Sequence, residues 1–182
     1  ADAVDETGKD EPPPPTEKSR HIIVIGYGRV GKAIVEGLAA QAAPFLVIED
    51  ADPRVDQARA AGCEVIVGNG AREDVLNLAN VRGASNLLVA IPNVFDAGAA
   101  AEQARKLNPA LHIVVRAHSD DEEAHLKHLG ASIVVLGGRE IGLGMLAQAA
   151  VDQAPPPAPA PESPPAAVEP ASPASPEAGP AG

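Results

Sequence analysis

The sequence has few of the residues that mark several common classes of protein. It contains one cysteine, Cys63, no tryptophan, one tyrosine and two phenylalanines among 182 residues. A single cysteine excludes an internal disulfide and fits a reducing compartment. We expect Cys63 to be a small buried side chain, because no neighbouring charge favours its thiolate.

Positive charge is also scarce. The chain has 14 Lys and Arg against 25 Asp and Glu, which gives a formal net charge of −11. DNA- and RNA-binding proteins present a basic stripe or aromatic stacking platforms, and this sequence offers neither. We therefore expect no nucleic-acid partner.

Long hydrophobic runs are missing as well. No run approaches the roughly 18 consecutive apolar residues that cross a bilayer, and no signal peptide is visible. The chain as given is expected to be soluble. Because it does not begin with methionine, we interpret it as a candidate segment of a longer protein.

Proline is concentrated at the two ends and is rare between them. Residues 1–20 are acidic and include four successive prolines, and residues 155–182 hold 11 of the 19 prolines with no Lys or Arg. Such segments bury too little apolar surface to offset the entropy lost on ordering. We predict a disordered acidic and proline-rich linker at 1–20, one domain at 21–154, and a disordered Pro/Ala-rich tail at 155–182.

Within the middle segment, short β-branched runs alternate with Ala- and Leu-rich helical patterns. The strands are expected at 21–25, 45–49, 64–68, 86–91, 112–116 and 132–136, and the helices near 29–42, 53–61, 71–79, 95–107, 120–128 and 138–150. Almost every strand position is apolar, which is typical of a parallel sheet covered on both faces. The pattern predicts an α/β protein with a Rossmann-like, doubly wound, six-stranded parallel sheet and helices on both faces.

Local signals support these helix boundaries. Pro53 follows Asp52 at one expected start, and "SDDE" at Ser119 to Glu122 matches a capping box. Gly62 and Gly130 stand where helices are expected to end.

The motif "GYGRVG" directly follows the first expected strand. Gly26 makes the tight turn, Gly28 lies where the backbone must approach a pyrophosphate, and Gly31 lets the helix pack close to the strand. The helix N-terminus then presents free N–H groups and a partial positive charge to a phosphate. Arg29 either pairs with that phosphate or faces solvent.

Polar residues follow the next three strands. Glu49 ends the second strand, where a carboxylate accepts both ribose hydroxyls of an adenosine and repels a 2′-phosphate, which favours NAD(H) or AMP over NADP(H). Asn69 in "GNGA" is placed to hydrogen-bond an adenine or a ribose, and Asn93 in "IPN" follows the fourth strand near the same crevice.

No catalytic residue or metal site is expected. His125 and His128 share a helix face but lack a third ligand, and the acids from Asp120 to Glu123 offset a helix dipole. Neither a Ser-His-Asp arrangement nor a Walker "GK[ST]" is present. A nucleotide site without visible chemistry indicates a sensor.

The chain resembles the TrkA-N, or RCK N-terminal, domain over about residues 21–150. The segments that carry the likeness include "IGYGRVGKAIVEGL", "LVIEDADPRVDQARAAGCEVIVGNGAREDVL", "LLVAIPN" and "GREIGLGML". Among such domains it is most similar to those at the C-terminus of cation:proton antiporter-2 family proteins of the Kef and YbaL type. The resemblance implies a Rossmann domain that binds NAD(H) or AMP as a regulatory ligand, forms a homodimer, and gates a K⁺:proton antiporter. It also implies a transmembrane part on the same polypeptide and a position at the cytoplasmic face of a bacterial inner membrane.

The resemblance also implies the contacts of individual residues. The phosphates are held by Gly26, Tyr27, Gly28, Arg29, Val30 and Gly31. The ribose is held by Glu49, with Asp50 next to it; Asn69 and Gly70 lie beside the adenosine, and Pro92 and Asn93 line the crevice. Arg116 and the segment around Glu140 resemble positions used at ligand or dimer contacts. Some family members carry Asp where Asn69 and Glu49 stand, which leaves the nucleotide preference open.

Our hypothesis is therefore a regulatory nucleotide-binding domain of a cation:proton antiporter. One alternative is a stand-alone Trk-type potassium-uptake subunit, which gates a separate membrane protein. A less favoured one is a small NAD-dependent oxidoreductase, which needs a substrate pocket built from loops alone.

Overall fold

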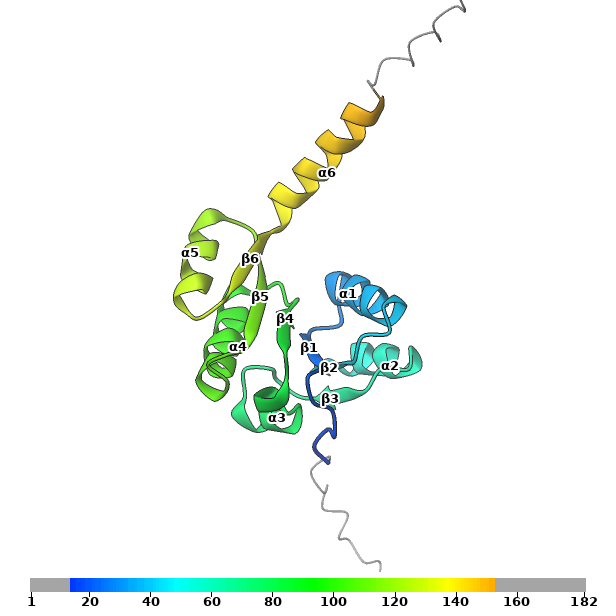
Figure 1. Ribbon diagram of the computed structural model, residues 1–182, viewed down its shortest axis with the longest axis vertical. Helices are drawn as coiled ribbons and strands as arrows, with labels where there is room; N and C mark the ends of the chain where they lie inside the picture. The colour runs from blue at the N-terminus through cyan, green and yellow to red at the C-terminus, as the bar shows by residue number, and fades with distance from the viewer. Residues whose placement is uncertain (1–13, 153–182) are drawn as a thin grey trace, which may run out of the picture.

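The computed structural model describes residues 14–152 of the chain (Figure 1). The strands are β1 (Ile22–Ile25), β2 (Phe45–Glu49), β3 (Val65–Val67), β4 (Asn86–Val89), β5 (His112–Ala117) and β6 (Ile133–Leu136). The helices are α1 (Arg29–Ala40), α2 (Asp52–Ala60), α3 (Glu73–Leu78), α4 (Val94–Leu107), α5 (Asp120–His128) and α6 (Gly137–Asp152), with a 3₁₀ turn, η1, at Val81–Gly83. The first 13 residues of the predicted linker and the whole predicted tail lie outside the described residues.

The six strands form one sheet in the order β3-β2-β1-β4-β5-β6, and every neighbouring pair is parallel. This order confirms the Rossmann-like prediction. The strand order reverses between β1 and β4, so the loops that follow these strands diverge to opposite faces of the sheet. Ligands of open parallel sheets bind in the crevice at this point.

Helices cover the two faces unequally (Figure 1). α1 and α2 pack on one face, over β1, β2 and β3, and α3, α4 and α5 pack on the other. α4 can approach the sheet closely because its buried positions are small: Ala97, Ala100, Ala101 and Ala104 recur at helical spacing. This face contains the larger core cluster, built on Ile23, Leu46, Leu87 and Ile113 among others.

The face on the α1 and α2 side is left open at β5 and β6. Ile133 and Val135 of β6 are 47% and 37% exposed, although the sequence predicts strands covered on both faces. The reason is the direction of α6, which projects away from the body instead of folding back over β6 (Figure 1). Its apolar side chains Ile141 and Met145 are 66% and 70% exposed.

The predicted helix signals act in three ways. The Ser119 hydroxyl accepts a hydrogen bond from the Glu122 N–H at 3.3 Å, and the Glu122 carboxylate accepts one from His118, the residue before the cap. Gly62 and Gly130 follow α2 and α5 with φ of +80° and +104°, as expected of helix ends. At α2, by contrast, Ala51 is the cap residue and Asp52 already belongs to the first turn.

Residues 14–20, predicted as part of the disordered linker, lie against the domain. Thr16 and Arg20 donate backbone hydrogen bonds to the carbonyl oxygens of Leu78 and Gly83 at 2.8 and 2.6 Å. Lys18 pairs with Glu64. These contacts lie at the amino ends of the strands, away from the crevice. None of the helices in the described part of the chain is long and apolar enough to cross a membrane.

Candidate functional site

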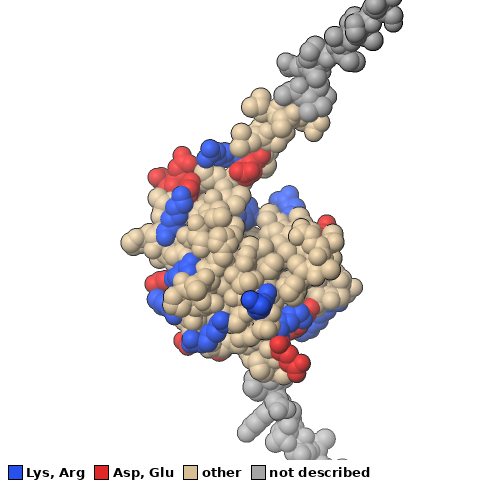
Figure 2. All heavy atoms as spheres, in the orientation of Figure 1, with Lys and Arg blue, Asp and Glu red and all other residues tan. Residues whose placement is uncertain are grey.

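A cleft follows the carboxyl ends of β1 to β5 and has two connected parts. The inner cavity, of about 230 Å³, is lined by Ile25, Gly26, Ile48, Glu49, Asp50, Arg54, Gly68, Asn69, Gly70, Ile91, Pro92, Asn93 and Asp96. The outer hollow, of about 1020 Å³, is lined by residues that include Gly28, Arg29, Val30, Arg116 and His118. Small-ligand pockets typically measure about 300–1,000 Å³, so the outer hollow lies at the upper end of that range and the inner cavity is somewhat smaller. Figure 2 shows a notch between α1 and the base of α6, with Lys and Arg atoms in it.

The three glycines of the motif have different reasons to be glycine. Gly26 has φ +95°, and a Cβ there would lie 2.8 Å from the Ile91 side chain. A Cβ on Gly31 would lie 1.9 Å from the carbonyl oxygen of Gly26, which no side chain can occupy. At Gly28 a Cβ would meet no protein atom within 4 Å. The fold therefore requires Gly26 and Gly31, whereas the space beside Gly28 is free for a ligand.

The N-terminus of α1 opens into the outer hollow without a cap. Gly28 is the cap residue and has no side chain to accept from the first-turn N–H groups, and the first turn contains no acid. In α4 and α5 the corresponding groups are capped by Asn93 and Ser119. The helices α2 and α3 also lack a side-chain cap, but each has an acid in its first turn. Among α1 to α5, α1 is therefore the helix with neither a cap nor an acid, and an anion is the partner that its first N–H groups prefer.

Tyr27 contributes its backbone rather than its ring. The side chain is 5% exposed and packs with Val35 and Ala58 on the α1 and α2 face of the sheet. The Lys32 ammonium lies 5.7 Å from the ring centroid. The Tyr27 side chain therefore points away from the cleft.

Cys63 packs beside the same cluster. It is half-buried, whereas the sequence predicted a buried side chain, and burial raises the pKa of its thiol.

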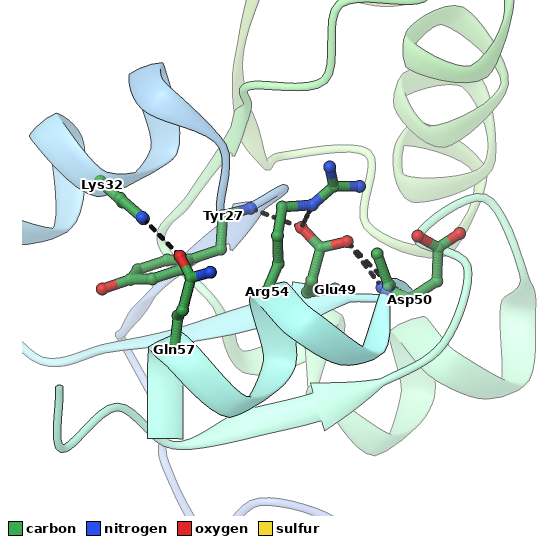
Figure 3. Close-up of polar contacts among 7 residues, drawn as sticks. Tyr27, Lys32, Glu49, Asp50, Arg54 and Gln57 are labelled. Carbon is green, nitrogen blue, oxygen red and sulfur yellow. Dashed lines mark hydrogen bonds and ion pairs between the residues drawn. The ribbon is translucent and has the colours of Figure 1, made fainter. Parts of the chain in front are cut away.

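Glu49 is held by four donors from this chain (Figure 3). Its Oε2 accepts from the backbone N–H of Tyr27 at 2.7 Å and from Nε of Arg54 at 3.0 Å. Its Oε1 accepts from the backbone N–H groups of Asp50 and Ala51, each at 3.0 Å. The residue is only 4% exposed. Burial alone would raise the pKa of this carboxyl, but the hydrogen bonds from Tyr27, Ala51 and Arg54 outweigh it and hold the pKa below its ordinary value.

This arrangement differs from the expected one, in which the carboxylate has free acceptor positions for the ribose hydroxyls. A carboxylate offers about four lone-pair positions, and here protein donors occupy all of them. Arg54 was not among the residues predicted to form the site, although its position in the sequence carries a signal. Arg54 lies in the first turn of the helix that follows the strand ending in Glu49, which brings a side chain back to that strand end.

The two asparagines line the inner cavity, and each is also engaged locally. The Asn69 Oδ1 accepts from the Ala71 N–H at 2.8 Å, so its amide NH₂ is the group left for a ligand. The Asn93 Oδ1 caps α4 by accepting from Phe95 and Asp96, at 2.9 and 3.3 Å. Helix capping thus accounts for Asn93 without any ligand.

The remaining predicted residues divide between the two cavities and the surface. Gly70 lies in the inner cavity, where a Cβ would meet Ile25 at 2.7 Å, so packing alone requires this glycine. Pro92 lines both cavities. The Arg116 Nη2 lies 3.4 Å from Nε2 of His118, at the end of β5. Glu140 is exposed on α6 and lines neither cavity.

Charge is distributed unevenly along the cleft. The carboxylates of Asp50 and Asp96 line only the inner cavity, and Arg29 and Arg116 line only the outer hollow. The paired Glu49 and Arg54 line both. The inner cavity suits a hydrogen-bond-donating group such as a ribose, and the outer hollow suits an anion. Within residues 14–152, no group of three or more His, Cys, Asp and Glu side chains is arranged to hold a metal ion.

The sheet order, the glycine turn and the strand-end carboxylate together define a Rossmann-type domain with a cleft suited to a nucleotide. The chain belongs to the TrkA-N domain family, whose model matches residues 22–137.

Specific relatives agree with this assignment. The chain is 40% identical over 143 residues to a protein named as a cation/proton antiporter, YbaL, of Escherichia coli (strain K12), covering 79% of this chain and 26% of that one. The crystal structure of the TrkA-N domain of inner membrane protein YbaL from Escherichia coli matches with a TM-score of 0.70 and 41% identity, over 73% of this chain and 98% of that one. The Kef CTD of Shewanella denitrificans, in its AMP-bound form, matches with a TM-score of 0.60 and 27% identity, over 72% and 80%. The chain thus spans about a quarter of the antiporter's length.

Proposed function

We propose that this chain is a regulatory domain that binds NAD(H) or AMP and gates a monovalent cation:proton antiporter, with K⁺ as the cation. The observation that carries the proposal is the free space at Gly28 beside the uncapped N-terminus of α1. The fold does not need glycine there, and the first-turn N–H groups lack a partner. A phosphate group satisfies both conditions.

The rest of the nucleotide follows from the charges of the cleft. A phosphate on the glycine turn lies in the outer hollow with Arg29 and Arg116, and the adenosine extends into the inner cavity toward Glu49 and Asn69. The AMP-bound Kef domain, at 27% identity, supports this choice of ligand. AMP would place its single phosphate on the glycine turn, whereas the second half of a dinucleotide would extend along the outer hollow.

Regulation rather than catalysis is the role we propose. The similarity to a protein named as an antiporter supports it. His118 is the one histidine among the residues that line the two described cavities, and its Nε2 faces the Arg116 guanidinium instead of a nucleophile. A base placed in this way has no reacting group of the protein to activate.

A second copy of the chain is the partner that the open face of the sheet favours. Ile133 and Val135 expose apolar surface on β6, and α6 exposes Ile141 and Met145 a short distance along the chain. An apolar helix and an apolar sheet face that do not meet within one chain can each be covered by their counterpart in a symmetric dimer. We therefore propose a homodimer joined through α6 and β6.

The membrane part and the location belong to the same proposal. The antiporter YbaL is about four times as long as its matched portion, so the remaining length can hold a transmembrane domain on the same polypeptide. In that arrangement this domain works at the cytoplasmic face of a bacterial inner membrane. The contacts of residues 14–20 would fix where the polypeptide enters the domain.

Gating requires the nucleotide to bind one dimer arrangement better than another, because a ligand with equal affinity for both shifts nothing. Sedimentation velocity of the 182-residue chain, with and without AMP or NADH, tests this. We expect a dimer whose sedimentation coefficient or dissociation constant changes with nucleotide, and a Gly28→Ala dimer that does not respond. A monomer indifferent to every nucleotide contradicts the proposal.

A further inference from the structure

Arg54 lies in the cleft, although it belongs neither to the glycine motif nor to the end of a strand. It is the one positively charged residue that lines both the inner cavity and the outer hollow. Its side chain is 48% exposed, while that of its partner Glu49 is 3% exposed. In Figure 3 the Nε faces Glu49 and the two terminal nitrogens point away from it. A ligand that enters the cleft therefore meets the guanidinium before the carboxylate.

The carboxylate of Glu49 has no acceptor position to spare. Three of its four donors are backbone N–H groups, held in place by the turns after β1 and β2. The fourth is Nε of Arg54, the only side-chain donor of the set. A ribose hydroxyl can donate to Glu49 only if one donor leaves, and a half-exposed side chain leaves at lower cost than a backbone turn.

We propose that Arg54 determines the selectivity of the site for phosphorylated nucleosides, by exchanging its partner when the ligand binds. This inference rests on the proposed function. A ribose hydroxyl takes the position of Nε on Oε2 of Glu49, and the released guanidinium turns within the outer hollow to the phosphate on the glycine turn. Hydrogen bonds are exchanged, and no covalent bond changes. The guanidinium has a carboxylate partner before binding and a phosphate partner afterwards.

The exchange separates nucleotides from nucleosides. AMP supplies both a hydroxyl for Glu49 and a phosphate for Arg54, so each charged group keeps a partner. Adenosine breaks the Arg54–Glu49 pair and offers the guanidinium nothing in return. Hydrogen bonds to charged groups are worth about 1.5–3 kcal/mol, which corresponds to a selectivity of roughly 10- to 100-fold.

The test is a double comparison by calorimetry on the 182-residue chain, with AMP and adenosine as the two ligands. Arg54→Met keeps the apolar stem and removes the donor and the charge. Arg59→Met, on the same helix and exposed, changes the net charge equally without lining either cavity. We expect the ratio of AMP affinity to adenosine affinity to fall at least about tenfold in Arg54→Met and to be unchanged in Arg59→Met.

A residue that only supports the fold would weaken both ligands together and leave the ratio unchanged. A ratio in Arg54→Met within about threefold of the wild-type value therefore overturns the inference, even if both affinities fall. Arg54→Lys provides a second variant that keeps the charge, and we expect it to retain part of the preference for AMP. If the wild-type chain binds neither AMP nor a dinucleotide, the proposed function itself fails, which is a different result from a ratio that does not change.

Discussion

The carbonyl oxygen of Gly26 lies 1.9 Å from the point where a Cβ of residue 31 would stand. Because that oxygen belongs to the backbone of a turn, it cannot move aside as a side chain could. We predict that Gly31→Ala lowers the free energy of unfolding by about 3 kcal/mol or more. Gly28→Ala is the matched control and should cost only about 1 kcal/mol, the ordinary difference between glycine and alanine at an N-cap. Urea unfolding measures both, and equal losses would contradict the distinction between the two glycines.

The hydrogen bonds of Glu49 should make the free energy of unfolding sensitive to acid pH. The pKa of its carboxyl is held below the ordinary value of 4.5, so its charged form stabilises the fold above that pH, and the stabilisation is lost as pH falls through the lowered pKa. Glu49→Gln should cost about 2 kcal/mol at pH 7, since hydrogen bonds to a charged group are lost. The difference between variant and wild type should shrink below pH 4.5. A difference that stays constant down to acid pH would contradict this account.

Burial of His21 should make the free energy of unfolding depend on pH in a second, higher range. The side chain is fully buried, its Nε2 lies 2.9 Å from the Ala79 carbonyl oxygen, and its Nδ1 has no hydrogen-bond partner among the described residues. Burial lowers its pKa below 6.5, so the unfolded chain binds a proton first and stability falls as pH drops below 6.5. His21→Gln keeps a donor for Ala79 and should remove this part of the slope. Thermal unfolding at pH 7.5 and 5.5 compares the two proteins, and an unchanged slope in the variant would count against the assignment.

The exposed face of α6 makes a prediction about assembly. Ile141→Asn combined with Met145→Asn removes two apolar side chains that are 66% and 70% exposed, so a monomer should gain solubility rather than lose stability. If α6 joins two copies, this double variant should sediment as a monomer at concentrations where wild type is a dimer. Gln148→Asn, an exposed polar change on the same helix, is the control. Identical sedimentation of all three proteins would exclude α6 from the interface.

Periodicity and turn residues predicted most of this fold. The six strands and six helices occur where β-branched runs and helical patterns alternate, because a buried parallel sheet demands nearly continuous apolar strands. The open face at β6 was not predictable in this way. The strand pattern of Ile133 and Val135 is the same whether a helix of the same chain or another surface covers it.

The site was predicted in part for a similar reason. Local motifs identify Gly26, Gly31 and Glu49, because their roles depend on the immediate turn and strand. The side-chain donor to the Glu49 carboxylate is Arg54, which lies on the following helix α2. In the sequence this arginine looks the same as any exposed arginine, so its residue type alone could not predict its role. Asn93 illustrates the converse problem. An asparagine after a strand can cap the next helix or contact a ligand, and the sequence alone does not distinguish the two; in the structure it caps α4.

Isothermal titration calorimetry of the 182-residue chain with AMP, NAD⁺ and NADH tests the central claim most directly, with Gly28→Ala as the matched variant. The account predicts that wild type binds at least one of the three, and that Gly28→Ala binds it at least about tenfold more weakly because its methyl group occupies the phosphate space. The unfolding free energy of the variant should fall by only about 1 kcal/mol, the ordinary cost of alanine in place of glycine at an N-cap, so the variant stays folded. No binding of any of the three to wild type, or equal binding to both proteins, would contradict a nucleotide site at the glycine turn.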